Sequence, residues 1–86
     1  MAQSAASLKK VTLELGGKAP LLVFDDCNFD LAVQTAMDAN FYTAGEVCSN
    51  ATRIFVQDTL KERFISAMIE KTAQMQVGDP MNPNCL

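Results

Sequence analysis

Two residues of this chain carry side chains suited to nucleophilic chemistry, and each stands close to glycine. Cys48 follows Gly45, and a thiolate is the strongest nucleophile among side chains at neutral pH. A second interpretation competes, because free cysteine is often buried as a small apolar group. Glu14 comes just before Gly16–Gly17 and has a carboxylate that could act as a general base. Its place in an alternating pattern is equally typical of a solvated strand residue.

The composition limits which chemistry this thiol could support. The 86 residues contain no histidine, so no Cys-His or Ser-His pair can form within the chain, and a base must be a carboxylate or a lysine. Cys27, Cys48 and Cys85 are widely spaced, which fits neither a disulfide framework nor a zinc site. We therefore interpret Cys27 and Cys85 as structural or incidental. Peroxide reduction is disfavoured, because no resolving cysteine is suitably spaced.

Charge and hydropathy exclude several classes of partner. Seven basic and ten acidic residues give a net charge of −3, and the longest basic run is Lys9–Lys10, so nucleic acid is not expected to bind. No apolar run approaches the roughly 20 residues of a membrane span, and no signal peptide is recognisable. We therefore expect a cytoplasmic protein without membrane contact. Hydrophobic residues make up 49% of the chain, which indicates that a partner or further chain covers some apolar faces.

The two candidate residues must be positioned by strands and a helix. Alternation over 11–15 predicts a strand, and the apolar run 21–24 predicts a second strand covered on both faces. A helix is expected from the capping residue Asn28 to about Thr43. Its apolar stripe is Phe29, Val33, Ala36, Met37 and Phe41. Gly45 would stop this helix, so Cys48 falls in the loop that leaves it.

A third strand is predicted at 52–56, and a second helix after it. Thr59 and Glu62 have the spacing of a capping box at the start of that helix, and 77–80 should end it. The order of elements predicts an α/β fold with a βαβ unit in a mainly parallel sheet. Glu14 and Cys48 would then meet at one rim of the sheet, where open α/β folds place their sites. Two helices cannot cover both faces of such a sheet, so chain outside these residues is expected.

Two motifs resemble the signatures of the NAD(P)-dependent aldehyde dehydrogenase family. Residues 13–18, Leu-Glu-Leu-Gly-Gly-Lys, with Pro20, are similar to its glutamate signature. Residues 45–48, Gly-Glu-Val-Cys, with Asn50, Thr52 and Arg53, are similar to its cysteine signature. The order and spacing of the two motifs also resemble the family, and the likeness covers nearly the whole chain. Residues 39–41 and 48–50 look most like the branch that acts on trimethylammonium aldehydes such as betaine aldehyde.

The resemblance implies that the protein oxidises an aldehyde to a carboxylate with NAD or NADP. Cys48 would attack the carbonyl to form a thiohemiacetal whose oxyanion accepts a hydrogen bond from the Cys48 N–H. Glu14 would activate the water that hydrolyses the later thioester. Leu15 and Gly16 would lie close to the nicotinamide, and the carbonyl of Leu8 would belong to a potassium site. The resemblance also implies a homo-oligomeric parent enzyme.

Two departures from the family pattern bear on this expectation. Glu46 stands where the family usually has glutamine, and a carboxylate near the sulfur would disfavour the thiolate unless its side chain points away. Ala51 stands where glycine is common, which matters only if the backbone there needs a positive φ. By resemblance, residues 1–86 are part of the catalytic domain, with the nucleotide-binding and oligomerisation segments absent. The isolated chain is expected to be inactive, and the alternative is a non-catalytic interaction or structural piece.

Overall fold

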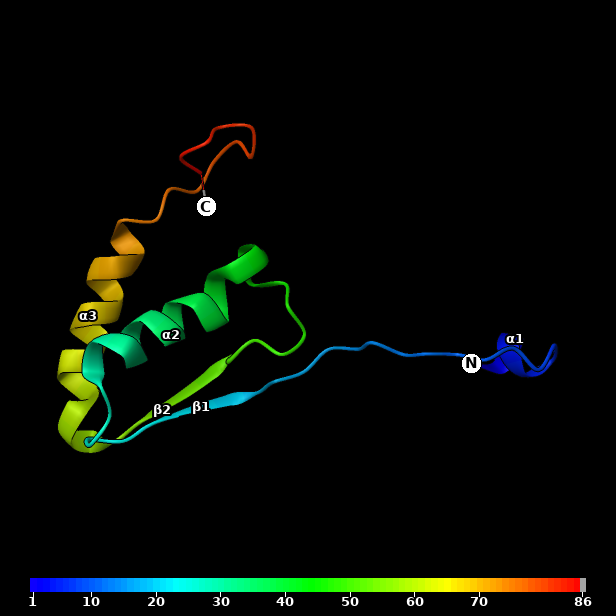
Figure 1. Cartoon of the computed structure of the whole chain (residues 1–86), viewed down its shortest axis with the longest axis horizontal. Helices are drawn as coiled ribbons and strands as arrows, with labels where there is room; N and C mark the ends of the chain where they lie inside the picture. Colours follow the sequence, from blue (N-terminus) through cyan, green and yellow to red (C-terminus); the bar gives the residue numbers. More distant parts are fainter. Residues whose placement is uncertain (86) are drawn as a thin grey trace.

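Two short parallel strands, joined by a helix, form the centre of the protein. The computed structural model describes residues 1–85, and in it β1 (Pro20–Val23) pairs with β2 (Arg53–Val56), with Pro20 opposite Arg53 and Val23 opposite Val56. The connection between the two strands contains α2 (Phe29–Phe41), so the predicted βαβ unit with parallel strands is confirmed (Figure 1). The chain continues through η2 (Asp58–Leu60) into α3 (Lys61–Ala73).

The predicted start of α2 is confirmed by its hydrogen bonding. The Asn28 side-chain oxygen accepts a hydrogen bond from the Leu31 N–H at 3.2 Å, which satisfies one of the free donors of the first turn. Asp30 lies in that turn, where its charge complements the positive end of the helix dipole. Val33, Ala36 and Met37 from the predicted stripe are buried.

The predicted capping box at the start of α3 is wrong. A short 3-10 turn, η2, takes the chain into the helix, whose N-cap is Leu60 and makes no side-chain cap bond. The Thr59 hydroxyl instead donates to Asp25 Oδ2 at 3.5 Å, because the loop after β1 lies beside it. The helix also ends earlier than expected, at Ala73.

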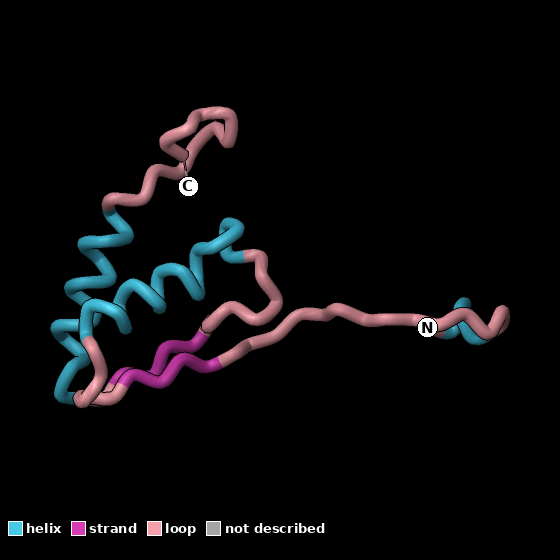
Figure 2. The backbone as a smooth tube through the Cα atoms, in the orientation of Figure 1, coloured by secondary structure: helices cyan, strands magenta, loops and turns pink. Residues whose placement is uncertain are grey.

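The core lies between the strand pair and the two helices, which cover the same face of the sheet (Figure 2). Val23, Val33, Ala36 and Phe64 are its buried members. The Phe64 ring meets the Phe29 ring edge to face, with centroids 6.3 Å apart, a favoured arrangement for aromatic pairs.

The opposite face of the sheet is open. Side chains alternate along a strand, so Leu22, Phe24 and Phe55 point away from the helices and are 58%, 59% and 56% exposed. Residues 1–85 cover only one face of the strand at 21–24, so its cover on both faces stays a prediction that depends on further chain. The two helices cover only one face of the sheet, as the sequence predicted.

The strand predicted at 11–15 does not form. Residues 9–19 run as an extended arm without strand pairing, and the short helix α1 (Ala2–Ala5) stands at the far end of this arm (Figure 1). Leu13 and Leu15 are 50% and 69% exposed. Alternation describes only which side chains share a face, whereas a strand also needs a neighbour for its backbone hydrogen bonds. No such neighbour lies beside the arm in the part of the chain that the structure describes.

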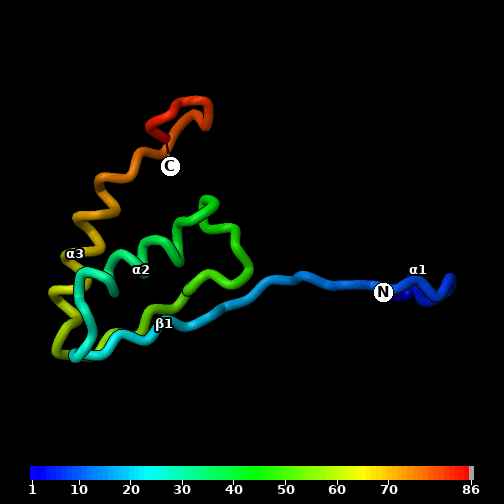
Figure 3. Tube along the Cα trace, viewed as in Figure 1, coloured from blue at the N-terminus to red at the C-terminus, as the bar shows by residue number. Residues whose placement is uncertain are grey.

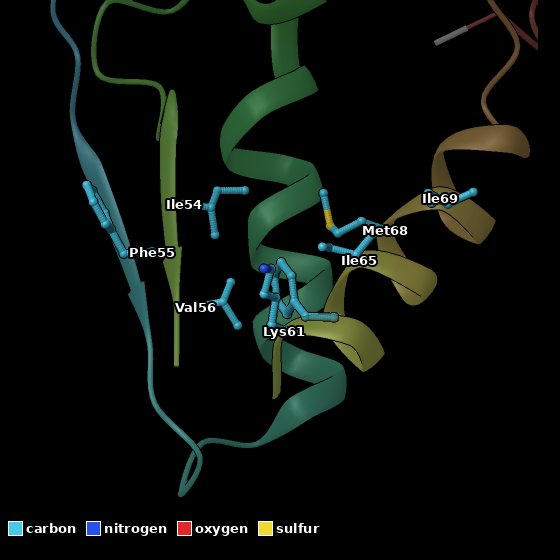
Figure 4. Close-up of a pocket in the computed structure, with 8 residues that line it drawn as sticks. Ile54, Phe55, Val56, Lys61, Ile65, Met68 and Ile69 are labelled. Atoms are coloured by element: carbon cyan, nitrogen blue, oxygen red, sulfur yellow. The ribbon is translucent and has the colours of Figure 1, made fainter. Parts of the chain in front are cut away.

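An apolar groove runs between β2 and α3 (Figure 4). It has a volume of about 550 Å³, and Ile54, Val56, Ile65 and Met68 are among its lining residues. Lys61 is the one charged residue of the lining, and no cysteine or carboxylate reaches it. The groove is therefore a surface for packing rather than for chemistry. Within residues 1–85, no helix has both the length and the apolar character that a membrane crossing requires.

Candidate active site

Cys48 lies in the loop between α2 and β2, as predicted. We call residues 46–52 the cysteine loop. The Asn50 N–H donates to the Val47 carbonyl at 3.0 Å, which closes a tight turn with Cys48 and Ser49 at its tip. Cys48 is an exposed free thiol. The alternative interpretation of Cys48 as a buried small apolar residue is thus wrong within the described chain.

The backbone reverses just before this loop through three residues in the left-handed region. The 3-10 turn η1 (Tyr42–Gly45) follows α2, and in it Thr43, Ala44 and Gly45 have φ values of 51°, 54° and 78°. The helix ends at Phe41, with Tyr42 as its C-cap, so Gly45 is not the residue that stops it and that prediction is wrong. Gly45 instead ends η1, where glycine adopts the left-handed region without a Cβ penalty. Thr43 and Ala44 do carry that penalty, of about 1–3 kcal/mol each. Strain of this size is characteristic of backbone next to functional residues.

The glutamate motif lies directly against the cysteine loop. A Cβ atom built on Gly17 would lie 2.6 Å from the Cys48 carbonyl oxygen, which only glycine tolerates. Next to it, Arg53 Nη1 donates to the Lys18 carbonyl at 3.4 Å. The two sequence motifs therefore meet in space at their backbones.

Glu14 stands three residues before this contact on the extended arm, and it is exposed. An extended chain advances at most about 3.6 Å per residue, so the Glu14 Cα lies within roughly 11 Å of the Gly17 Cα. The rim of the sheet does bring the two motifs together, although Glu14 itself is not on a strand.

A family model described as "Aldehyde dehydrogenase family" matches residues 1–86. The chain belongs to the aldehyde dehydrogenase family. Among curated relatives, it is 56% identical over 82 residues to the betaine aldehyde dehydrogenase of Vibrio vulnificus strain YJ016 and 51% identical over 82 residues to that of Brucella ovis. Each alignment covers 95% of this chain and 17% of the relative. The chain thus spans about a sixth of the length of these enzymes.

Solved structures of aldehyde dehydrogenases contain the same backbone path, arm included. The betaine aldehyde dehydrogenase of Staphylococcus aureus, solved in complex with NAD+, matches with a TM-score of 0.85 at 36% identity over 98% of this chain and 17% of its own. The aldehyde dehydrogenase of Bacillus cereus, also solved with NAD+, matches with a TM-score of 0.88 at 32% identity, with the same coverage. The extended arm is therefore a conformation that this family adopts.

The predicted cofactor contacts, Leu15 and Gly16, are on the open side of the arm. Leu15 is 69% exposed, and a Cβ atom on Gly16 would meet nothing within 4 Å. Both residues are therefore accessible in the structure, and their contact with a cofactor stays a prediction.

Leu8 is not brought to the site. The helix α1 lies at the end of the arm distant from the strands (Figure 3). Leu8 follows α1 in the chain, is 93% exposed and has a φ of 51°. Within residues 1–85, no three acidic, cysteine or histidine side chains form a metal-binding group. A potassium ion at the Leu8 carbonyl remains a prediction.

The two departures from the family pattern have little structural effect. Ala51 is buried, and it is not among the residues with positive φ, so alanine causes no backbone strain there. The Glu46 side chain is exposed, where water and salt screen its charge.

Sequence reasoning missed two features of the aldehyde dehydrogenase segment. Asn50 is buried, with 6% of its surface exposed, although asparagine beside a loop is usually solvated. A hollow of about 440 Å³ lies between the end of α2 and the cysteine loop. Asp38 and Tyr42 contribute a carboxylate and an aromatic ring to its lining. The sequence signal that could have revealed the hollow is the four-residue spacing of Asp38 and Tyr42, which places both residues on one side of the end of α2.

Proposed function

We propose that this chain forms the active-site segment of an NAD(P)-dependent aldehyde dehydrogenase in which Cys48 is the nucleophile. The observation that carries the proposal is the contact between Gly17 and the Cys48 carbonyl, because it joins the two motifs that the chemistry requires. The exposure of the thiol also supports a role in reaction rather than in packing.

The Cys48 thiolate would attack the aldehyde carbon and form a thiohemiacetal. The Cys48 N–H makes no hydrogen bond within residues 1–85, so it is free to donate to the oxyanion that develops. Bound NAD or NADP supplies the acceptor for the hydride of this intermediate. The backbone of Leu15 and Gly16 would hold the nicotinamide on the open side of the arm.

Glu14 would act in the second half of the reaction. Its carboxylate would remove a proton from water, which then attacks the thioester on Cys48 and releases the carboxylic acid. The exposed position of Glu14 on the arm leaves room for that water.

The substrate we propose is betaine aldehyde or a related trimethylammonium aldehyde. The betaine aldehyde dehydrogenases that resemble this chain support this choice. So does the hollow beside the cysteine loop, because a carboxylate and an aromatic face attract quaternary ammonium groups. Asp38 and Tyr42 would supply these two contacts.

The remaining proposals concern the setting of the enzyme. We propose a cytoplasmic homo-oligomer with a potassium ion near Leu8. The open apolar face of Leu22, Phe24 and Phe55 favours a second candidate function for the isolated chain, namely that of an inactive piece that associates with other chain.

A segment graft tests the catalytic proposal. The 82 aligned residues of the Vibrio vulnificus enzyme are replaced by the matching residues of this chain, and we call the product the grafted enzyme. It should form reduced cofactor in the presence of betaine aldehyde. Its Cys48→Ala variant should lose at least about a thousandfold in kcat.

The isolated chain provides the matched comparison. It is expected to show no aldehyde-dependent reduction of NAD+ or NADP+, because the residues that would complete the cofactor site are not in it. An inactive grafted enzyme, or an active Cys48→Ala variant, would refute the role of Cys48.

A further inference from the structure

The cysteine loop is attached to the C-terminal end of α2 by two hydrogen bonds. The last carbonyls of a helix have no partner within it and must find donors elsewhere. The Ala39 carbonyl accepts a hydrogen bond from the Ala51 N–H at 3.1 Å, and the Asn40 carbonyl accepts one from Asn50 Nδ2 at 3.3 Å. Both donors come from residues just after Cys48. The loop that carries the thiol therefore also caps the helix.

Asn50 joins the turn around Cys48 to this cap. Its N–H closes the turn onto the Val47 carbonyl, and its own carbonyl accepts from the Thr52 N–H at 2.8 Å. It is the one buried polar residue in the part of the chain that the structure describes. An amide in such a place is costly unless it is hydrogen-bonded, so its bond to Asn40 fixes where the side chain must lie.

Gly45 leaves space for the same bond. A Cβ atom there would lie 3.1 Å from the Asn40 carbonyl oxygen and 4.0 Å from Asn50 Nδ2. The left-handed backbone at Gly45, which glycine adopts without strain, thus brings the chain past the acceptor without crowding it. The end of α2, the buried amide of Asn50 and the glycine at position 45 therefore all contribute to the hydrogen bond from Asn50 to the Asn40 carbonyl.

We infer that Asn50 is a positioning residue for Cys48, an inference that rests on the proposed function. Its backbone holds one end of the turn, and its side chain ties that end to the rigid helix. Without the side-chain bond, the turn would be anchored by the neighbouring Ala51 N–H and by β2. A misplacement of the reacting sulfur by about 1 Å can cost on the order of a hundredfold in rate.

Asn50→Asp in the grafted enzyme tests this role, because it keeps the shape of the side chain and removes the donor. Its kcat, per Cys48 thiol titrated in folded enzyme, should fall about tenfold to a hundredfold. The KM for NAD+ should stay within about twofold. Asn50→Ala, which adds no charge, should show the same pattern of kcat and KM. In Asn50→Ala the rate at which iodoacetamide alkylates Cys48 should also stay within about threefold, because the thiol is misplaced rather than chemically altered.

Asn40→Asp is the matched control. It makes the same chemical change at the end of α2, but the Asn40 amide donates to the Ala36 carbonyl at 2.8 Å, within the helix itself. Its loss of kcat should be below about threefold, because the bond that it removes does not reach the loop.

Several outcomes would overturn the inference. The first is a kcat of an Asn50 variant within about threefold of that of the grafted enzyme. The second is an equal loss of kcat in Asn40→Asp. The third is a rate of Cys48 alkylation in Asn50→Ala that falls in parallel with kcat. Failure of both Asn50 variants to fold while Asn40→Asp folds would make Asn50 purely structural. An inactive parent graft would instead refute the proposed function, so the two failures are distinguishable.

Discussion

Gly17 packs so closely against Cys48 that a Cβ atom at position 17 would lie 2.6 Å from the Cys48 carbonyl oxygen. Real side chains do not tolerate such a distance from backbone, so this glycine determines how near the arm comes to the cysteine loop. The contact explains why position 17, the second of the two glycines after Glu14, requires glycine. It also makes the geometry of the site sensitive to one methyl group.

Gly17→Ala is expected to push the cysteine loop away from the arm. In the grafted enzyme, kcat with betaine aldehyde should fall about tenfold to a hundredfold, since the reacting groups are displaced. Gly78→Ala serves as control, because a Cβ atom at Gly78 meets nothing within 4 Å. Steady-state kinetics of both variants check this, and equal activities would contradict the packing argument.

Glu14→Gln should separate the two halves of the reaction. In the proposed mechanism the attack by Cys48 does not use Glu14, so a rapid first turnover of reduced cofactor should remain in stopped-flow measurements. Steady-state turnover should fall about a hundredfold to ten-thousandfold, because the thioester then waits for an unassisted water. Loss of the first turnover would show that Glu14 acts earlier.

Tyr42→Ala should weaken the binding of cationic aldehydes selectively. The KM for betaine aldehyde should rise about fivefold, as expected for a loss of about 1 kcal/mol of cation–π attraction. The KM for 3,3-dimethylbutanal, a neutral aldehyde of the same shape, should change by less than about twofold. Tyr42→Phe keeps the ring and should resemble the parent. A parallel rise for both aldehydes would mean that Tyr42 contributes shape rather than charge recognition.

Phe64→Ala should destabilise the chain much more than a change on the exposed side of the same helix. Phe64 is 3% exposed and packs on the Phe29 ring, so its truncation should cost about 3–5 kcal/mol in the free energy of unfolding. Ile69 is 64% exposed, and Ile69→Ala should change the free energy by less than about 0.5 kcal/mol. Urea unfolding followed by circular dichroism compares the two. Similar losses in the free energy of unfolding for both variants would show that the Ile69 side chain is packed against other residues.

Local features of the chain were predictable because their causes are local. The Asn28 cap and the stripe of Val33, Ala36 and Met37 depend on residues within a few positions of one another. The parallel pairing followed from the order of strand, helix and strand. The capping box at Thr59 failed, because Thr59 lies inside the 3-10 turn η2 and the N-cap of α3 is the next residue, Leu60.

The sequence by itself therefore determined the two longer helices, the parallel strand pair and the two motifs that resemble those of the aldehyde dehydrogenase family. Only the tertiary structure decided that residues 11–15 form an unpaired arm, that Gly17 rests on the Cys48 carbonyl, and that Asn50 is buried as a cap of α2. Strand pairing, close approach and burial all depend on what lies next to a residue in space. Neighbours distant in sequence provide these conditions, and no local pattern reports them.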